Sequence, residues 1–355
     1  MSRFFSGRYS SLEPYVPGEQ PRERKYIKLN TNESPFPPSA AGAEAAAAEY
    51  ERLMLYPDPT ASELRKVFAE TFETGTENII FSNGSDDLLN FSFMAFCDDR
   101  TGAAFPDVTY GFYKVFAALN HIDYKEIPLK DDLTIDPDDY KGCGRTCFIA
   151  NPNAPTGIAL APAEIEELVS ADPDHIVIVD EAYVDFGAES CVPLTRKYDN
   201  ILVIGTFSKS RSFAGARFGY AIGNAELIND LNTLIYSTNP YNVNRMTMAA
   251  AAAVLKDEEY TRSNCRTIME NREYTLSELR RLGFEATDSL ANFVFAESPD
   301  IPGEDLYLRL KERGILIRHF STERIRNYNR ITVGSLEDMK TLITNISEIL
   351  TEVKE

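Results

Sequence analysis

The sequence predicts an α/β protein with a large domain, in which a mostly parallel sheet lies between helices, and a smaller α+β C-terminal domain. Three observations predict this fold class. Short strand-like runs alternate with helical patterns over residues 78–222, several of these runs are apolar throughout, and the pattern changes after Gly283. Alternation of strands and helices is typical of parallel sheets, and continuous apolar strands indicate burial on both faces. The 355 residues also exceed the length at which one core stops growing.

The chain begins with an irregular segment and two helices. Residues 1–40 are rich in proline, glycine and charge, and predict an N-terminal arm. The alanine-dense stretch at 40–55 predicts a helix that ends before Tyr56-Pro57-Asp58-Pro59. A second helix is expected from Thr60 onward, because apolar residues at 64, 67, 68 and 72 share one face. We expect the large domain to span residues 41–255 and the small domain to span residues 256–355.

The remaining elements follow from apolar periodicity and glycine turns. In the large domain we expect strands at 79–82, 102–105, 123–127, 146–150, 175–180, 201–205 and 218–222, with helices at 85–96 and 110–119. A long helical stretch at 242–282 leads to the small domain. There we expect strands at 291–296, 314–318 and 330–333, and helices at 303–313 and 336–353.

The composition restricts the partners and the compartment. The formal charge of −19 argues against nucleic acid and against anionic membranes. The N-terminus lacks the apolar core of a signal peptide, and no apolar run is long enough to span a membrane. Five cysteines, an odd number without zinc spacing, predict reduced thiols, no metal site and a cytoplasmic location. Cys143 and Cys147 form a C-x-x-x-C pattern that we interpret as thiols flanking a strand.

Two strand ends carry residues that suggest covalent chemistry. Lys209 lies on a short polar segment between two apolar runs, where an ammonium is costly to bury and its amine can become nucleophilic. Asp180 closes the apolar run at 176–179, where a carboxylate needs a cation or a donor such as a protonated ring nitrogen. Tyr183, three residues later, is placed to bond a neighbouring oxygen. The alternatives are an ordinary loop lysine and an aspartate that caps the next helix.

Other strand ends offer an anion site. Asn83-Gly84-Ser85-Asp86 would present backbone N–H groups and a hydroxyl at a helix N-terminus, although Ser85 or Asp86 could merely cap that helix. Thr206, Ser208 and Arg217 add hydroxyls and a guanidinium that suit a dianionic phosphate. Because ligands gather at the carboxyl ends of strands in open α/β sheets, we expect these groups to meet.

Two further segments complete the set. Tyr110, at a helix start, can stack on a flat ring, or it can be a packing tyrosine. The proline-rich loop at 151–157 can aim an amide at a ligand hydroxyl, or it can be only a turn. Each signal is weak alone. Together they match the requirements of pyridoxal 5′-phosphate, which needs an amine for its aldehyde, a carboxylate for its ring nitrogen, an aromatic face and a phosphate cup.

With these motifs the chain resembles the fold-type-I aminotransferases over nearly its whole length, and most of all the histidinol-phosphate aminotransferase family. The supporting segments are Leu29-Asn30-Thr31-Asn32-Glu33-Ser34-Pro35, Tyr56-Pro57-Asp58, Asn83-Gly84-Ser85-Asp86, Pro155-Thr156-Gly157, Asp180-Glu181-Ala182-Tyr183, Ser208-Lys209 with Arg217, Pro240-Tyr241-Asn242-Val243-Asn244, Ala291-Asn292-Phe293 and Arg330-Ile331-Thr332-Val333-Gly334.

The resemblance implies a role for each matching residue. It implies Lys209 as the aldimine-forming lysine and proton shuttle, Asp180 on the pyridine nitrogen, Tyr183 on the ring hydroxyl and Tyr110 against the ring. The implied phosphate ligands are Ser85, Asp86 through its N–H, Thr206, Ser208 and Arg217. The implied substrate-binding residues are Tyr15, Asn32, Arg318 and Arg330. Tyr56 would reach the neighbouring subunit's cofactor, so a homodimer is expected.

One position departs from the family pattern. The family has an asparagine directly before Pro-Thr-Gly, bonded to the ring hydroxyl, whereas this chain has Ala154. We expect that Asn153 could take its place.

The resemblance implies transamination between histidinol phosphate and 2-oxoglutarate in histidine biosynthesis. The alternatives are an aromatic amino acid aminotransferase and a threonine-phosphate decarboxylase. A non-catalytic binding protein on the same fold is a further alternative, against which the combination of Lys209 and Asp180 argues. A dinucleotide-binding enzyme is disfavoured, because no G-x-G-x-x-G follows the first strand.

Overall fold

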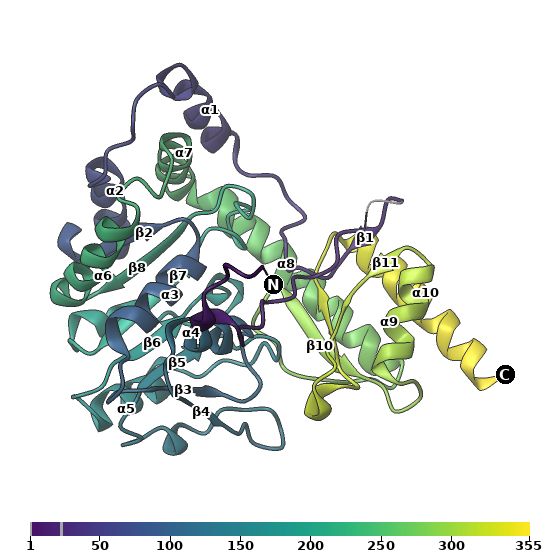
Figure 1. Ribbon diagram of the computed structural model, residues 1–355. Coiled ribbons are helices and arrows are strands. Elements are labelled where there is room, and N and C mark those ends of the chain that lie inside the picture. The colour runs from purple at the N-terminus through teal and green to yellow at the C-terminus, as the bar shows by residue number, and fades with distance from the viewer. Residues whose placement is uncertain (1, 22–23) are drawn as a thin grey trace.

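The computed structural model describes residues 2–21 and 24–355, and their larger part is built on a seven-stranded sheet (Figure 1). The strand order is β2-β8-β7-β6-β5-β3-β4. The strands are β2 (Ile79–Ser82), β3 (Ala103–Pro106), β4 (Tyr124–Ile127), β5 (Thr146–Ala150), β6 (Val177–Asp180), β7 (Ile201–Thr206) and β8 (Gly219–Gly223). β8 is antiparallel to both of its neighbours, and every other pairing is parallel. The mostly parallel sheet predicted from the sequence is thus confirmed.

Helices cover both faces of this sheet because alternate strand residues point to opposite sides. In β6, Val177 and Val179 pack into one core and Ile178 into the other. The first core receives α2 (Ser62–Phe72), α5 (Pro162–Ala171) and α7 (Arg245–Lys256). The second receives α3 (Ser85–Phe96), α4 (Phe112–Asn120) and α6 (Ala225–Thr238). Burial on both faces explains why these strands are apolar throughout.

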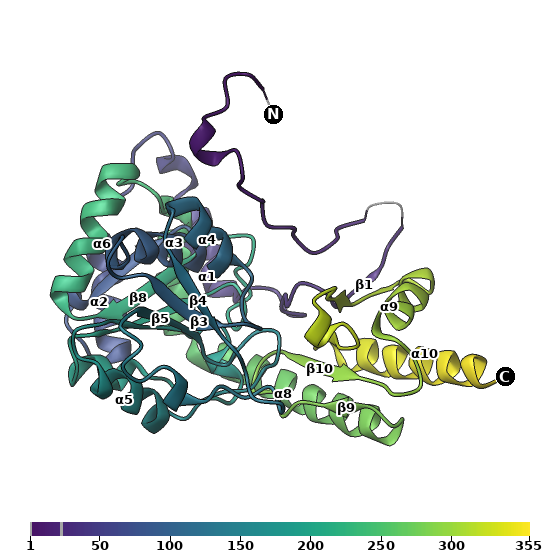
Figure 2. The ribbon, with the colours of Figure 1, turned by 60° about the horizontal axis from the view of Figure 1, so that its bottom comes forward.

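The C-terminal part has its own antiparallel sheet and its own core. The strand order is β12-β13-β10-β9, formed by β9 (Glu285–Ala286), β10 (Phe293–Glu297), β12 (Arg318–His319) and β13 (Asn329–Thr332). The apolar faces of α9 (Gly303–Glu312) and α10 (Leu336–Lys354) pack into the same core as β10 and β13. The long helix α8 (Glu258–Arg281) runs alongside the C-terminal sheet and packs into its core (Figures 1 and 2). The domain limits at residues 40 and 255 remain a prediction.

Several elements differ from the expectations. The helix expected at 40–55 is α1 (Ala40–Ala48), followed by a short 3-10 turn at Tyr50–Arg52. The long helix expected at 242–282 is broken at Asp257 into α7 and α8. The strand expected at 314–318 divides into β11 (Ile315–Leu316) and β12, which join different sheets. Helices α5 and α6 were not predicted.

The N-terminal arm is not wholly irregular. Its strand β1 (Ile27–Lys28) pairs in parallel with β11, so the arm is attached to the C-terminal part of the chain. Further upstream, the ring of Tyr15 stacks on Phe112 of α4, with 4.1 Å between the ring centres. The arm therefore crosses from one sheet region to the other. Among the described residues, no helix combines the length and the hydropathy needed to cross a bilayer.

Candidate active site

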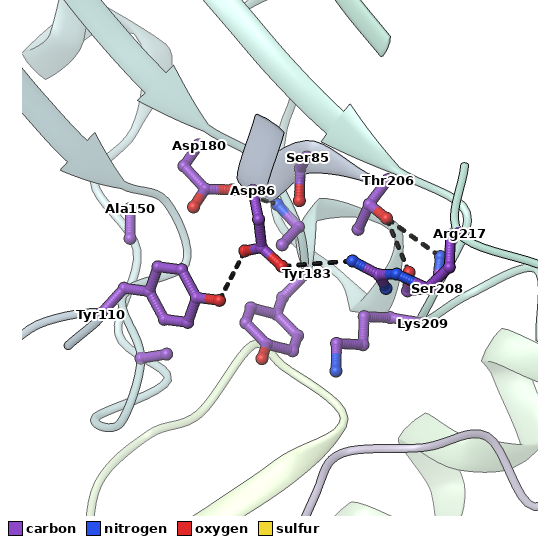
Figure 3. Close-up of a pocket in the computed structure, with 12 residues that line it drawn as sticks. Ser85, Asp86, Tyr110, Ala150, Asp180, Tyr183, Thr206, Ser208, Lys209 and Arg217 are labelled. Atoms are coloured by element: carbon purple, nitrogen blue, oxygen red, sulfur yellow. Dashed lines mark hydrogen bonds and ion pairs between the residues drawn. The ribbon is translucent and has the colours of Figure 1, made fainter. Parts of the chain in front are cut away.

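The strand ends that the sequence singled out meet around one cavity. β2, β3, β5, β6 and β7 run in the same direction, so their carboxyl ends lie at one edge of the sheet. A cavity of about 560 Å³, including its open mouth, lies at this edge (Figure 3). Its lining consists of Ser85, Asp86, Tyr110, Ala150, Ala154, Asp180, Ala182, Tyr183, Thr206, Ser208, Lys209 and Arg217. All of these except the three alanines are predicted site residues.

Asp180 is a carboxylate held in an unfavourable environment. It ends β6 with only 5% of its surface exposed. One oxygen accepts a hydrogen bond from the Ala182 N–H, and the other accepts one from the Tyr113 hydroxyl at 3.2 Å. Burial raises the pKa of Asp180 to about 7, although these two hydrogen bonds act in the opposite direction. A cationic donor in the cavity would stabilise the ionised carboxylate.

Lys209 faces the same cavity from the segment after β7. Its Nζ donates to the Thr31 carbonyl at 3.2 Å and lies 5.8 Å from the centre of the Tyr183 ring. The Tyr183 hydroxyl in turn accepts a hydrogen bond from Asn32 Nδ2 at 3.0 Å. Figure 3 shows Lys209 and Asp180 on opposite sides of the space, with the Tyr183 ring beside it. The amine and the carboxylate can therefore contact different parts of one bound molecule.

The anion cup is built at the N-terminus of α3. Gly84 is the N-cap and has no side chain, so neither Ser85 nor Asp86 caps the helix as the alternative interpretation proposed. Gly84 has a φ of +89°, and a Cβ there would lie 2.4 Å from Arg217 Nη2. This position therefore requires glycine both for its backbone conformation and for the close approach of Arg217. Helix N–H groups with a positive dipole end and a guanidinium form a site for a dianion.

Side chains complete the cup. Thr206 Oγ1 donates to Ser208 Oγ at 2.9 Å and accepts from the Ser208 N–H at 3.1 Å. Arg217 Nη2 contacts Asp86 Oδ2 at 3.2 Å, and Asp86 Oδ1 accepts the Tyr110 hydroxyl at 2.7 Å. A dianion bound by Arg217 would repel the Asp86 carboxylate, so the contribution of Asp86 to such a ligand is restricted to its backbone N–H.

The expectation for Asn153 is not supported by its position. Asn153 is 1% exposed and does not line the cavity. Its amide nitrogen donates to the Val108 carbonyl and to Thr156 Oγ1, and its oxygen accepts from Thr109. These bonds hold the loop together and leave Ala154 as the cavity wall. The side-chain amide of Asn153 therefore makes its hydrogen bonds to the surrounding carbonyls and hydroxyls, not to the cavity.

A second cavity adjoins the first, since Tyr110 and Ala154 line both. It is about 810 Å³ including its mouth, and it contains the predicted substrate residues Tyr15, Arg318 and Arg330. The two arginines are directly opposed across β12 and β13. Arg330 Nη2 donates to the Asn30 carbonyl at 3.2 Å, and burial lowers the pKa of its guanidinium. Two adjacent guanidiniums make this cavity suitable for anionic groups.

Besides Asn153, two predicted residues lie outside both cavities. Asn32 is buried and bonds Tyr183, so it can act on the site through that hydroxyl. Tyr56 is 78% exposed and stacks on Tyr241 with 4.5 Å between ring centres. Within the single chain Tyr56 therefore does not contact the cavity lining, and its role across a dimer stays a prediction.

The sequence analysis missed two contacts that shape the site. Tyr113, the partner of Asp180, follows Tyr110 by one helical turn, and that spacing was the available signal. Arg324 Nη1 contacts Asp107 Oδ2 at 2.8 Å, and its Nη2 donates to the Leu129 and Lys130 carbonyls at 2.6 Å. This contact joins the two sheet regions beside the second cavity, and nothing in the local sequence indicates it.

The donor set fits pyridoxal 5′-phosphate. The cup offers hydroxyls, helix N–H groups and a guanidinium for the phosphate, and Tyr110 and Tyr183 can contact the ring. Burial raises the pKa of Asp180, whereas a protonated ring nitrogen beside the carboxylate would stabilise its ionised form. The amine of Lys209 lies across the space from it. A pyridoxal-phosphate enzyme of fold type I, and among these an aminotransferase, is the class that the fold and this site define.

Comparison with known proteins identifies the family. The model of the family "Aminotransferase class I and II" matches residues 24–346, and the chain belongs to this family. It is 47% identical over 352 residues to the histidinol-phosphate aminotransferase of Brachyspira hyodysenteriae, with 99% of each chain covered. It is 42% identical over 351 residues to the enzyme of that name from Clostridium acetobutylicum, covering 99% of this chain and 100% of the relative.

A solved structure supports the fold. It is the histidinol-phosphate aminotransferase from Sinorhizobium meliloti in complex with pyridoxal-5′-phosphate, with a TM-score of 0.90, 22% identity and 99% of each chain covered. The relatives and the family confirm that this chain is a pyridoxal-phosphate-dependent aminotransferase, as the motifs predicted.

Proposed function

We propose that this aminotransferase transfers the amino group of histidinol phosphate to 2-oxoglutarate. The observation that carries the proposal is the pair of opposed arginines, Arg318 and Arg330, in the cavity that adjoins Lys209 and Asp180. The amino donor would carry a phosphate and the acceptor two carboxylates, so both need cationic groups at this position. The names of relatives at 42–48% identity over nearly the full length support the same substrate.

The bound cofactor would supply a carbonyl for the amino group and a ring that accepts the electron pair left when a proton leaves the substrate. Ser85, Thr206, Ser208 and Arg217 would hold its phosphate, and Tyr110 would lie against its ring. Asp180, which binds the ring nitrogen in this scheme, keeps a proton on that nitrogen. Burial raises the pKa of Asp180 because it disfavours the ionised carboxylate. A cation beside the carboxylate would stabilise that ionised form.

Lys209 is the group we propose to move the substrate proton. Its Nζ donates to the Thr31 carbonyl and faces the Tyr183 ring, and these two contacts position it in the first cavity. Proton transfer by a positioned side chain typically contributes about 10²–10⁴-fold to a rate, and we expect a contribution of this order from Lys209. Tyr183, oriented by Asn32, would bond the ring hydroxyl.

Substrate binding would use the arm as well as the two arginines. A guanidinium can hold a phosphate or a carboxylate through two parallel hydrogen bonds. Tyr15 lines the same cavity from the arm, and its ring stacks on Phe112. Closure by Tyr15 would limit access of water to the reacting atoms.

We further infer that the enzyme acts as a homodimer in the cytoplasm. A cluster of exposed apolar residues surrounds Tyr56, and an exposed patch of this kind often marks an interface. Its members are Tyr50, Leu53, Met54, Leu55 and Tyr56. The five cysteines are all free thiols, which favours a reducing compartment.

The substrate is tested by turnover of the purified, cofactor-loaded enzyme. Histidinol phosphate, phenylalanine and threonine phosphate are each supplied with 2-oxoglutarate, and glutamate and carbon dioxide are measured. We expect glutamate with the highest kcat/KM for histidinol phosphate. A higher kcat/KM for phenylalanine would identify an aromatic aminotransferase, and release of carbon dioxide from threonine phosphate would identify a decarboxylase. Either result would refute the proposed substrate.

The dimer is tested by complementation. A Lys209→Ala chain mixed with a Tyr56→Ala chain forms hybrids in which one site has both native residues. Random mixing would then restore up to about a quarter of wild-type activity, if each variant alone is weak. A monomeric mass by light scattering, or no recovery in isolated hybrids, would contradict the shared site.

A further inference from the structure

Cys143 and Cys147 form a pair of thiols that the transamination does not use. Their sulfur atoms lie 3.6 Å apart. Cys147 is the second residue of β5, and it is in register with Val177 of β6 and Ala104 of β3. The pair therefore lies at the amino end of the strand, whereas the candidate active site lies at the carboxyl ends.

The two thiols differ in exposure and in acidity. Cys143 is partly exposed, whereas Cys147 is 5% exposed and packs in the core. A hydrogen bond from the Cys147 thiol lowers the pKa of Cys143 to about 6, and the same contact together with burial raises the pKa of Cys147. A partly exposed thiol of lowered pKa beside a buried thiol of raised pKa is the arrangement of a reactive cysteine with a resolving partner.

The loop that carries Cys143 has room to move. Gly142 and Gly144 flank it with φ values of +64° and +65°, and a Cβ added to either would meet no atom of residues 2–21 and 24–355 within 4 Å. The sulfurs must approach by about 1.5 Å to reach a disulfide bond length of about 2.05 Å. Because the open, glycine-flanked loop can make this movement, Cys147 can remain in its strand.

We propose that Cys143 and Cys147 are a thiol–disulfide site, in which Cys143 reacts with a hydroperoxide and Cys147 resolves the product. In the first step the Cys143 sulfur attacks a peroxide oxygen. The S–O bond forms, the O–O bond breaks, the sulfur is oxidised by two electrons, and hydroxide or an alkoxide leaves and takes up a proton. In the second step the Cys147 sulfur attacks the Cys143 sulfur, the S–O bond breaks, and the leaving hydroxide takes the Cys147 proton as water. A dithiol then reduces the Cys143–Cys147 disulfide by thiol–disulfide exchange, which restores both thiols while the dithiol itself becomes a disulfide.

The other cysteines serve as internal controls. Cys97, Cys191 and Cys265 are buried, and burial raises the pKa of each thiol. Thiols of this kind react slowly with peroxide because the thiolate is the nucleophile. Selective loss of the Cys143 and Cys147 thiols, with the other three retained, would therefore distinguish this site from general oxidation.

The experiment treats the folded, cofactor-loaded enzyme with a small excess of hydrogen peroxide and then alkylates the remaining thiols in denaturant. Trypsin cuts after Arg145, which lies between the two cysteines, and glutamyl endopeptidase separates Cys147 from Cys191. The disulfide then appears in the mass spectrum as two linked peptides, one with Cys143 and one with Cys147. We expect two thiols to be lost, the linked pair to appear while turnover is retained, and dithiothreitol to remove it.

Three outcomes would overturn the proposal. They are full retention of all five thiols, linkage of Cys143 to any other cysteine at a similar level, and appearance of the linked pair only after turnover is lost. A second measurement uses Cys147→Ser, in which Cys143 should accumulate a dimedone-reactive sulfenic acid. Because the first measurement is made on the wild-type enzyme, the test does not depend on the folding of this variant.

Discussion

Tyr113 is the residue whose substitution tests the environment of Asp180 most directly. Its ring is fully buried, and its hydroxyl donates to Asp180 Oδ2 at 3.2 Å. The substitution Tyr113→Phe removes that hydroxyl and keeps the ring, which packs near Tyr110, Phe105 and Phe148. We expect the folded structure to persist and the Asp180 carboxylate to become harder to ionise.

The size of the effect follows from the geometry. A hydrogen bond to a charged group contributes about 1.5–3 kcal/mol, and 3.2 Å is long for an O–H···O bond, so the lower value applies. At about 1.4 kcal/mol per unit, this raises the pKa of Asp180 by roughly one unit above its value of about 7. At pH 7 the ionised fraction then falls from about a half to about a tenth. If cofactor binding requires the ionised Asp180 carboxylate, the affinity of the variant for the cofactor should be about fivefold lower than that of wild type at pH 7. The two affinities should converge near pH 9.

The assay is a titration of the apoprotein with pyridoxal 5′-phosphate, followed by the visible absorbance of the bound cofactor between pH 6 and pH 9. At each pH we compare the ratio of the variant dissociation constant to the wild-type one. The titration of the cofactor itself affects both proteins alike and cancels in this ratio. Tyr140→Phe is a matched control, since the buried hydroxyl of Tyr140 has no hydrogen-bond partner among the described residues and Tyr140 does not line the cavity. A ratio near one at every pH for Tyr113→Phe would refute the reasoning.

Three further substitutions have defined outcomes. Lys209→Ala should lower kcat by at least about a thousandfold while the protein stays folded by circular dichroism, and near-normal turnover would rule out its proton transfer. Because burial raises the pKa of Asp180 from 3.8 to about 7, its contribution to apoprotein stability is present below pH 4 and is lost as the pH rises to about 7. Between pH 4 and pH 8 the free energy of unfolding in urea should therefore fall by up to about 4 kcal/mol more in wild type than in Asp180→Asn, and parallel curves would contradict this. Arg324→Ala removes the contact to Asp107 and should raise KM for the amino donor by up to about tenfold with unchanged cofactor absorbance, whereas an unchanged KM would show that the contact does not position the arginines.

Much of the fold follows from local sequence. The predicted limits of β2, α3 and β5 agree with the observed elements, because an apolar run bounded by polar or glycine residues fixes a buried strand or helix. The element limits that were predicted wrongly share a different cause. The break at Asp257 and the division of residues 314–318 between two sheets depend on which neighbours the chain meets after it has folded.

The site shows the same division between local and tertiary information. Lys209, Asp180 and Arg217 could be selected from the sequence, because a charged residue beside an apolar strand needs a partner and so indicates function. The only local signal for Tyr113 is its spacing from Tyr110, and a packing tyrosine would show the same spacing. Asn153 was expected at the cavity but does not line it, because the direction of a loop side chain depends on the surrounding carbonyls and hydroxyls.

The sequence by itself determined the chemistry of this protein, since it contains the amine, the carboxylate and the anion-binding groups at the ends of apolar strands. Only the tertiary structure decided which of them share a space. Arg324 and Asp107 are separated by 217 residues, and Lys209 bonds a carbonyl 178 residues away. Contacts at such separations leave no local pattern, because they result from the packing of two sheets and an arm around one cavity.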